Sequence, residues 1–132
     1  MADIVLENGM PIVKKVTCAI DCGIVVNPLG AMNQAKGGVI DGVGHAMYSD
    51  FAFKNGKPQS NNFNTYQLIR MAQTPKVDVH FVQNDIAPTG LGEPTLPPAG
   101  GAIANAIYQA TGARLTKQPY MVNLNITKEV KA

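Results

Sequence analysis

The sequence predicts an α+β domain in which a mixed sheet and two main helices form two layers. The predicted elements follow the order β-α-β-β-β-α-β, which is typical of this class. Both long helical patterns are rich in small residues, which favours close packing. The chain has 132 residues and is 45% hydrophobic, enough for one domain with its own core over residues 1–132.

The N-terminal part predicts a pair of strands. Ile12–Ile20 mixes β-branched with polar residues and is expected to be a strand. Asn8-Gly9, just before it, is a turn signal, so Ile4–Glu7 is expected to pair with this strand as a hairpin. Asn27-Pro28 closes the strand region and is expected to open a helix.

A helix is predicted from Leu29 to about Asp50. Its apolar residues recur at spacings of three and four: Leu29, Met32, Ala35, Val39, Val43, Ala46 and Met47. Gly37, Gly38, Gly42 and Gly44 make this stretch a poor helix by propensity. These glycines suit either close packing between helices or close approach of a cofactor.

The middle of the chain carries a second hairpin signal. Phe51–Phe53 and Pro58–Ser60 flank Lys54-Asn55-Gly56-Lys57, a sequence typical of a tight turn between strands. Asn61–Met71 is expected to be irregular, and Lys76–Gln83 is expected to be a strand because Val77, Val79 and Phe81 alternate with polar residues.

The C-terminal third begins with a long loop, Asn84–Pro98. A helix rich in small residues is predicted over Ala99–Thr111, with Gly112 as its C-cap. A final strand is predicted over Pro119–Ile126, followed by a frayed end at Thr127–Ala132.

Composition excludes several classes of function. The net charge is +2 and the basic residues are scattered, so nothing indicates a nucleic-acid partner. No apolar run approaches the ~20 residues of a membrane span. The N-terminus lacks the pattern of a signal peptide, which leaves cytoplasm and periplasm both open. Only 15% of residues are charged, which predicts that much of the surface contacts other protein.

Cys18 and Cys22 are predicted to be free thiols. In an extended chain, residues four apart lie about 13 Å from each other, beyond disulfide reach. His45 and His80 show no spacing typical of metal ligands. The residues therefore predict no protein-bound metal site.

Gly90-Leu91-Gly92-Glu93-Pro94 is the most informative stretch for function. No other ionisable side chain lies within six residues of Glu93, and glycine and proline surround it. A lone carboxylate in a rigid, apolar loop suits a general base, since low polarity raises a carboxyl pKa. The alternative is an acidic residue that interacts with the dipole of the following helix.

Four segments, in order, resemble the molybdenum hydroxylases of the xanthine dehydrogenase and aldehyde oxidase family. They are Cys18–Pro28, Gln34–Gly44, Asn62–Tyr66 and Gly90–Pro94, and the resemblance runs from about Lys14 to Tyr120. It is greatest to the large, molybdopterin-binding subunit of the isoquinoline 1-oxidoreductase type. The resemblance implies a fold like that of the molybdenum-cofactor-binding domains.

The resemblance also implies a chemistry and a set of site residues. A molybdenum–molybdopterin cofactor would oxidise an N-heterocycle or an aldehyde with oxygen from water, and electrons would leave through iron–sulfur clusters on a partner small subunit. By motif position, Glu93 is the catalytic base and Gln34 contacts the pterin. Gly92, Gly37 and Gly38 would lie at the cofactor. The pterin holds the metal, so no protein ligand is expected.

The large subunits of this family are several times longer than this chain. The resemblance therefore predicts a C-terminal fragment that packs against the rest of the subunit and is inactive in isolation. The low charge and the many small apolar residues predict that the isolated chain self-associates. A different possibility is a non-catalytic structural or oligomerisation module in which the Glu93 loop is inherited with the fold.

Overall fold

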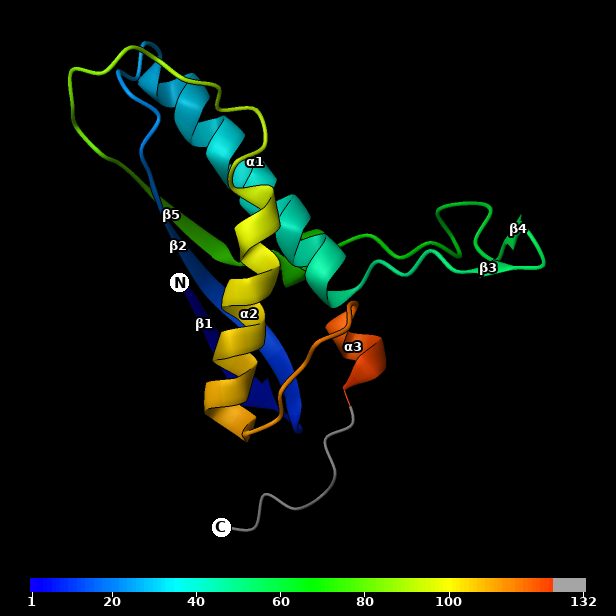
Figure 1. Ribbon diagram of the computed structural model, residues 1–132. Helices are drawn as coiled ribbons and strands as arrows, with labels where there is room; N and C mark the ends of the chain where they lie inside the picture. Colours follow the sequence, from blue (N-terminus) through cyan, green and yellow to red (C-terminus); the bar gives the residue numbers. More distant parts are fainter. Residues whose placement is uncertain (125–132) are drawn as a thin grey trace.

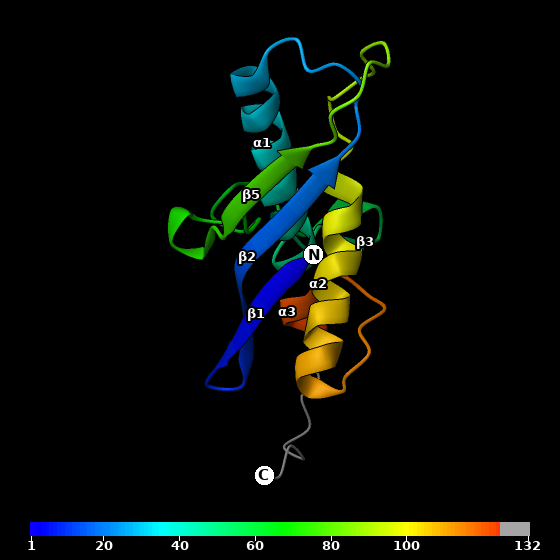
Figure 2. The same ribbon diagram turned by 90° about the vertical axis from the view of Figure 1, so that its left-hand side faces the viewer.

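The computed structural model of the chain describes residues 1–124, which form two layers (Figures 1 and 2). The sheet contains β1 (Ala2–Glu7), β2 (Met10–Ile20) and β5 (Lys76–Phe81). Helices α1 (Pro28–Met47) and α2 (Leu96–Thr111) cover one of its faces. This arrangement confirms the predicted α+β class with a mixed sheet and two main helices.

The sheet is mixed because its two pairings run in different directions. β1 is antiparallel to β2, and Asn8 and Gly9 form the predicted turn between them with φ of 53° and 78°. β2 is parallel to β5, from Lys15 opposite Lys76 to Ile20 opposite Phe81. Helix α1 lies in the connection between these parallel strands, as such a crossover requires.

The core lies between the sheet and the helices. Its buried members are Val13, Val16, Val39, Val43, Ala46, Met47, Val77, Ile103, Ala104, Ile107 and Tyr120. The outer face of the sheet is polar: Lys15 and Asp78 form an ion pair of 2.8 Å there. The hydrogen bond from Lys15 lowers the pKa of the Asp78 carboxyl below its ordinary value.

The predicted strand over Pro119–Ile126 is wrong for the residues that the structure describes. Tyr120–Asn123 form a short helix, α3. Tyr120 is buried, and its hydroxyl donates a hydrogen bond of 3.0 Å to the carbonyl oxygen of Gly100 in α2. This tertiary contact outweighs the strand propensity of the segment. The predicted frayed end, Thr127–Ala132, lies outside the described residues.

Helices α1 and α2 pack closely because α1 presents glycines at their crossing. A Cβ atom added at Gly42 would lie 2.6 Å from the carbonyl oxygen of Leu96 and 2.8 Å from Cβ of Ala99. Larger residues would force the helices apart. The packing role predicted for the glycines therefore holds at Gly42.

Between α1 and β5 lies a long connection, residues 49–75, which we call the arm. Its outer part leaves the two-layer body (Figure 1), whereas Ile69 near its end packs against the core. It carries two short paired strands, β3 (Phe53–Lys54) and β4 (Lys57–Pro58), and a 3-10 helix, Met71–Gln73. Asn55 and Gly56 form the predicted turn, with φ of 51° and 74°. The hairpin prediction is confirmed, although its strands are shorter than expected.

The arm carries the most exposed aromatic surface of the described residues. Phe51, Phe53 and Phe63 are 51%, 64% and 68% exposed. Phe51 packs edge-to-face against Phe53 and Tyr66, with ring centroids 5.1 and 5.7 Å away. An exposed apolar cluster of this kind favours association.

We expect the isolated chain to self-associate through this arm. Light scattering across micromolar concentrations should show a mass that rises with concentration, and the double variant Phe53→Ser, Phe63→Ser should shift the protein towards monomer. The control is Val26→Ser, which removes an apolar side chain that is even more exposed, at 81%, but lies outside the arm. A wild-type chain that stays monomeric at every concentration would contradict this expectation.

Within residues 1–124, no helix combines the length and the apolar character needed to cross a membrane.

Candidate active site

Two hydrogen bonds tie the Glu93 loop to helix α1. The side-chain amide of Gln34 donates through Nε2 to the carbonyl oxygen of Gly92. The hydroxyl of Thr95 donates to the carbonyl oxygen of Ala35 over 3.1 Å. We call these two bonds the loop anchors. Because Gln34 and Ala35 are consecutive residues, the same turn of α1 holds both ends of the segment that contains Glu93.

Glu93 lies between the loop anchors with its side chain exposed. Its backbone carbonyl accepts a hydrogen bond of 3.2 Å from the amide of Leu96, where α2 begins. Within residues 1–124, its carboxylate takes part in no ion pair and no side-chain hydrogen bond. The structure therefore leaves this carboxylate available to an outside group, close to the N-terminus of a helix.

The loop before Glu93 is fixed along the turn that follows β2. The side-chain amide of Asn84 donates to Oδ1 of Asp21 over 2.7 Å, and the amide of Thr89 donates to the carbonyl of Cys22 over 2.9 Å. Gly23 has φ of 71°, and an added Cβ would press on the carbonyl oxygens of Ile86 and Ala87. The residues that lead into Gly90–Pro94 thus lie beside Cys18–Pro28, although the two stretches are far apart in the sequence.

Asp21 and Asn27 act as a turn residue and a helix cap. Asp21 accepts a hydrogen bond from the amide of Gly23, and Asn27 caps α1 by accepting a bond of 3.0 Å from the amide of Gly30. Both fix the path of the backbone beside the Glu93 loop.

Leu91 gives the loop an apolar attachment. It packs against a small cluster formed by Ile20, Cys22 and Ala35. Cys18 also contacts this cluster, and both cysteines are free thiols, as predicted. Burial raises the pKa of the Cys18 thiol above its ordinary value. These thiols are therefore packing groups beneath the loop.

The predicted cofactor-binding residues differ in how accessible they are. Gln34 is exposed, and a Cβ added at Gly37 or Gly92 would meet nothing within 4 Å, so the backbone there is open to a ligand. Gly37 follows Gln34 by three residues and lies on the same side of α1. Gly38 is different, because an added Cβ would collide with Oγ1 of Thr95.

Sequence analysis missed Thr95. The local sequence offered one indication of this residue, because threonine is a favoured N-cap and Thr95 directly precedes Leu96-Pro97. In the structure Thr95 is the N-cap residue of α2, yet its side chain makes no capping bond and instead reaches α1. A contact between residues 60 positions apart cannot be predicted from the local sequence.

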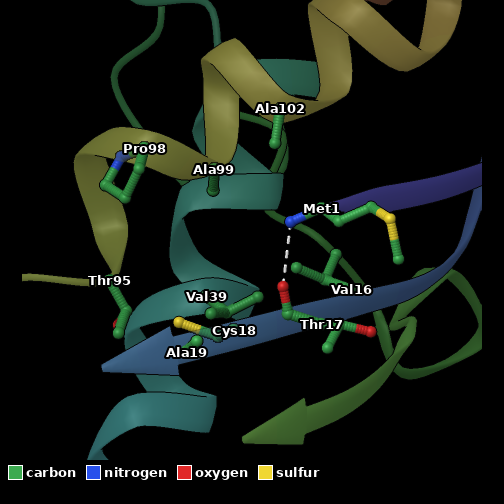
Figure 3. Close-up of a pocket in the computed structure, with 10 residues that line it drawn as sticks. All are labelled: Met1, Val16, Thr17, Cys18, Ala19, Val39, Thr95, Pro98, Ala99 and Ala102. Carbon is green, nitrogen blue, oxygen red and sulfur yellow. Dashed lines mark hydrogen bonds between the residues drawn. The ribbon is translucent and has the colours of Figure 1, made fainter. Parts of the chain in front are cut away.

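An apolar cavity of about 190 Å³ lies on the other side of Thr95, between β2 and the start of α2 (Figure 3). Cys18, Val39, Pro98 and Ala102 are among its lining residues. Ligand pockets usually measure about 300–1,000 Å³, and neither Gln34 nor Glu93 lines this one. We therefore place the candidate site on the open surface around Gln34, Gly92 and Glu93.

This surface has the chemistry of one wall of a cofactor site. The amide of Gln34 keeps Oε1 as an acceptor, and the backbone at Gly37, Gly90 and Gly92 is uncovered. These groups fit a flat heterocycle with many donors and acceptors, but they do not enclose it. Within residues 1–124, no three His, Cys, Asp or Glu side chains gather as metal ligands.

The model of a molybdopterin cofactor-binding domain matches residues 3–75, more than half of the chain. The chain therefore belongs to this family. The relatives that it matches are large subunits of the xanthine dehydrogenase and aldehyde oxidase type. The match includes Gln34, Gly37 and Gly38. Glu93 lies beyond its end.

Two relatives and one solved structure agree with this assignment. The chain is 39% identical to a membrane-bound aldehyde dehydrogenase of Gluconacetobacter polyoxogenes, over 86% of the chain and 15% of that protein. It is 36% identical to isoquinoline 1-oxidoreductase subunit beta of Brevundimonas diminuta, over 86% of the chain and 14% of that subunit. Quinoline 2-oxidoreductase of Pseudomonas putida 86 shares the fold, with a TM-score of 0.78 and a sequence identity of 16%. The similarity covers 90% of this chain and 17% of that one.

The chain thus spans only about a seventh of the length of these relatives. The name of the first relative assigns it pyrroloquinoline quinone, whereas the family model describes molybdopterin. We follow the family model, because it describes the matched residues themselves.

Proposed function

We propose that the chain forms part of a molybdenum hydroxylase that oxidises an aldehyde or an N-heterocycle with oxygen derived from water. Its contribution is the loop that carries the general base, together with one wall of the molybdopterin site. The observation that carries this proposal is the hydrogen bond from Gln34 to Gly92, which joins the proposed pterin-contacting residue to the proposed base loop. The test is kcat of the wild-type and Glu93→Gln enzymes at equal molybdenum content.

Each residue has a stated task in this proposal. The cofactor, when bound, supplies oxygen transfer and takes up the electrons. Glu93 accepts a proton through its exposed carboxylate, which has no ion-pair partner within residues 1–124. Gly92 and Gly37 present bare backbone to the ligand, and Gln34 offers Oε1 to the pterin. Gly38 would not contact the cofactor directly; it would leave room for the side chain of Thr95.

The proposal requires partners. Residues 1–132 would act as a single domain that packs against the rest of the large subunit, which supplies the other walls of the site and the substrate channel. Iron–sulfur clusters on a small subunit would carry the electrons away. One relative is itself named as a subunit, and the chain covers about a seventh of it. The open surface around Glu93 agrees with a site that other protein completes.

A non-catalytic role in assembly is the second candidate. The exposed aromatic arm is the observation that favours it, because such a surface suits contact with another protein. Glu93 would then only interact with the N-terminus of α2. The Glu93→Gln comparison separates the two candidates, since only the first predicts a loss of turnover.

We expect the isolated chain to bind no molybdenum cofactor stably and to turn over no substrate. The reason is that the surface around Gln34 and Gly92 forms one wall, whereas ligand sites bury about 70–90% of a ligand. Elemental analysis of the purified chain should find molybdenum far below one atom per chain, with the complete enzyme as the positive control. Stoichiometric molybdenum in the isolated chain would contradict this expectation.

A further inference from the structure

Thr95 is buried, at 3% exposed, and shares with Tyr120 the feature of a hydroxyl on a buried side chain. Its hydroxyl donates to the carbonyl oxygen of Ala35. Ala35 lies inside α1, where carbonyl groups already have partners within the helix. The bond is therefore not needed to complete α1. It satisfies the buried hydroxyl and fixes the position of Thr95 relative to α1.

Gly38 makes room for this hydroxyl. A Cβ atom added at Gly38 would collide with Oγ1 of Thr95, whereas the same atom at Gly37 would meet nothing within 4 Å. Neighbouring glycines of one helix thus differ in what they face. Gly38 forms a notch that receives Thr95, and Gly37 faces open space.

We propose that Thr95 is a positioning residue for Glu93, held by Ala35 and by the notch at Gly38. This inference rests on the proposed role of Glu93 as the base. The base stands between the loop anchors, so both ends of its segment are fixed to α1. A misplacement of about 1 Å in a reacting group can cost roughly 10²-fold in rate, which makes such fixation valuable to catalysis.

The experiment compares matched variants of the complete enzyme. Thr95→Val removes the hydroxyl while keeping the volume, and Gly38→Ala fills the notch. We expect each to lower kcat by about 10–10²-fold, with KM and molybdenum content unchanged. Thr95→Ser keeps the hydroxyl and should retain most of the wild-type kcat. Gly101→Ala is the control, because a Cβ added at this exposed glycine of α2 would meet nothing within 4 Å and Gly101 lies outside the proposed cofactor site, so it should behave as wild type.

Amide hydrogen exchange gives a second readout that needs no cofactor. Peptides that cover residues 90–96 should exchange faster in Thr95→Val and Gly38→Ala than in wild type, Thr95→Ser or Gly101→Ala. Peptides from β2 and β5 should be unchanged. Faster exchange throughout the domain, together with lost molybdenum, would show a general structural role instead and would overturn the proposal.

Two further outcomes would also overturn it: a wild-type kcat in Thr95→Val, or a Thr95→Ser enzyme as slow as Thr95→Val. The Glu93→Gln enzyme, measured alongside, separates this inference from the proposed function. If Glu93→Gln is inactive and Thr95→Val is fully active, only the positioning role is wrong. If Glu93→Gln keeps a normal kcat, the base assignment itself is wrong.

Discussion

Replacing Glu93 with glutamine in the complete enzyme is expected to lower kcat by about 10²–10⁴-fold, the usual cost of removing a general base. Glutamine keeps the volume and most of the hydrogen bonding of the side chain but cannot accept the proton. The loss should lie at the upper end of this range, because the nearest carboxylate in the sequence is Asp85, eight residues away. Folding and molybdenum content should be unchanged, since the side chain is exposed and has no ion-pair partner among the described residues.

The measurement is steady-state kcat with molybdenum content determined on the same samples. Asp85→Asn is the matched control, because it neutralises the other acidic residue of the same loop and should leave kcat close to wild type. If Glu93 serves only the helix dipole, the variant should lose about 0.3–1 kcal/mol of stability and keep its turnover. A fully loaded Glu93→Gln enzyme with normal kcat would end the assignment.

Replacing Ile103 with alanine is expected to lower the free energy of unfolding by about 2–5 kcal/mol. Ile103 is 0% exposed and lies in α2, where the helix faces the sheet (Figure 2). Its removal takes apolar atoms out of the core and leaves a space that the surrounding helices and strands fill only in part. Domains of this size are stable by about 5–15 kcal/mol, so one such change is a large share of the total.

Chemical denaturation of the isolated chain, followed by circular dichroism, measures this loss. Ile86→Ala is the control, because Ile86 is more than half exposed in the loop before Glu93. That change should stay within about 0.5 kcal/mol of wild type. A loss below 1 kcal/mol for Ile103→Ala would mean that α2 does not pack on the sheet as described.

The sequence predicted the elements that have strong local signals. The turns at Asn8-Gly9 and Asn55-Gly56 follow from residues that tolerate positive φ, and Gly112 caps α2 with φ of 72° as expected. Helix α2 begins at Leu96, before its predicted start at Ala99. Prolines are tolerated in the first helical turn, where their missing amide has no partner to lose.

The features that the sequence did not predict depend on distant contacts. The sequence around Tyr120 predicts a strand, but the hydroxyl of Tyr120 donates a hydrogen bond to the carbonyl oxygen of Gly100 in α2. For the candidate site, sequence analysis named Gln34, Gly92 and Glu93, and the structure brings them together. Thr95 could not be found in this way, because its partner Ala35 lies 60 residues earlier in the chain.

The position of the arm has a consequence for how this protein can diverge. The arm begins after α1 ends at Met47 and finishes where β5 begins, whereas Gln34, Ala35 and Gly38 precede it in the helix. Insertions or deletions at the Asn55–Gly56 turn would change how far the arm reaches but would not alter the loop anchors. A change of length at this turn would therefore leave the contacts that hold the Glu93 loop on α1 in place, because both loop anchors join residues outside the arm.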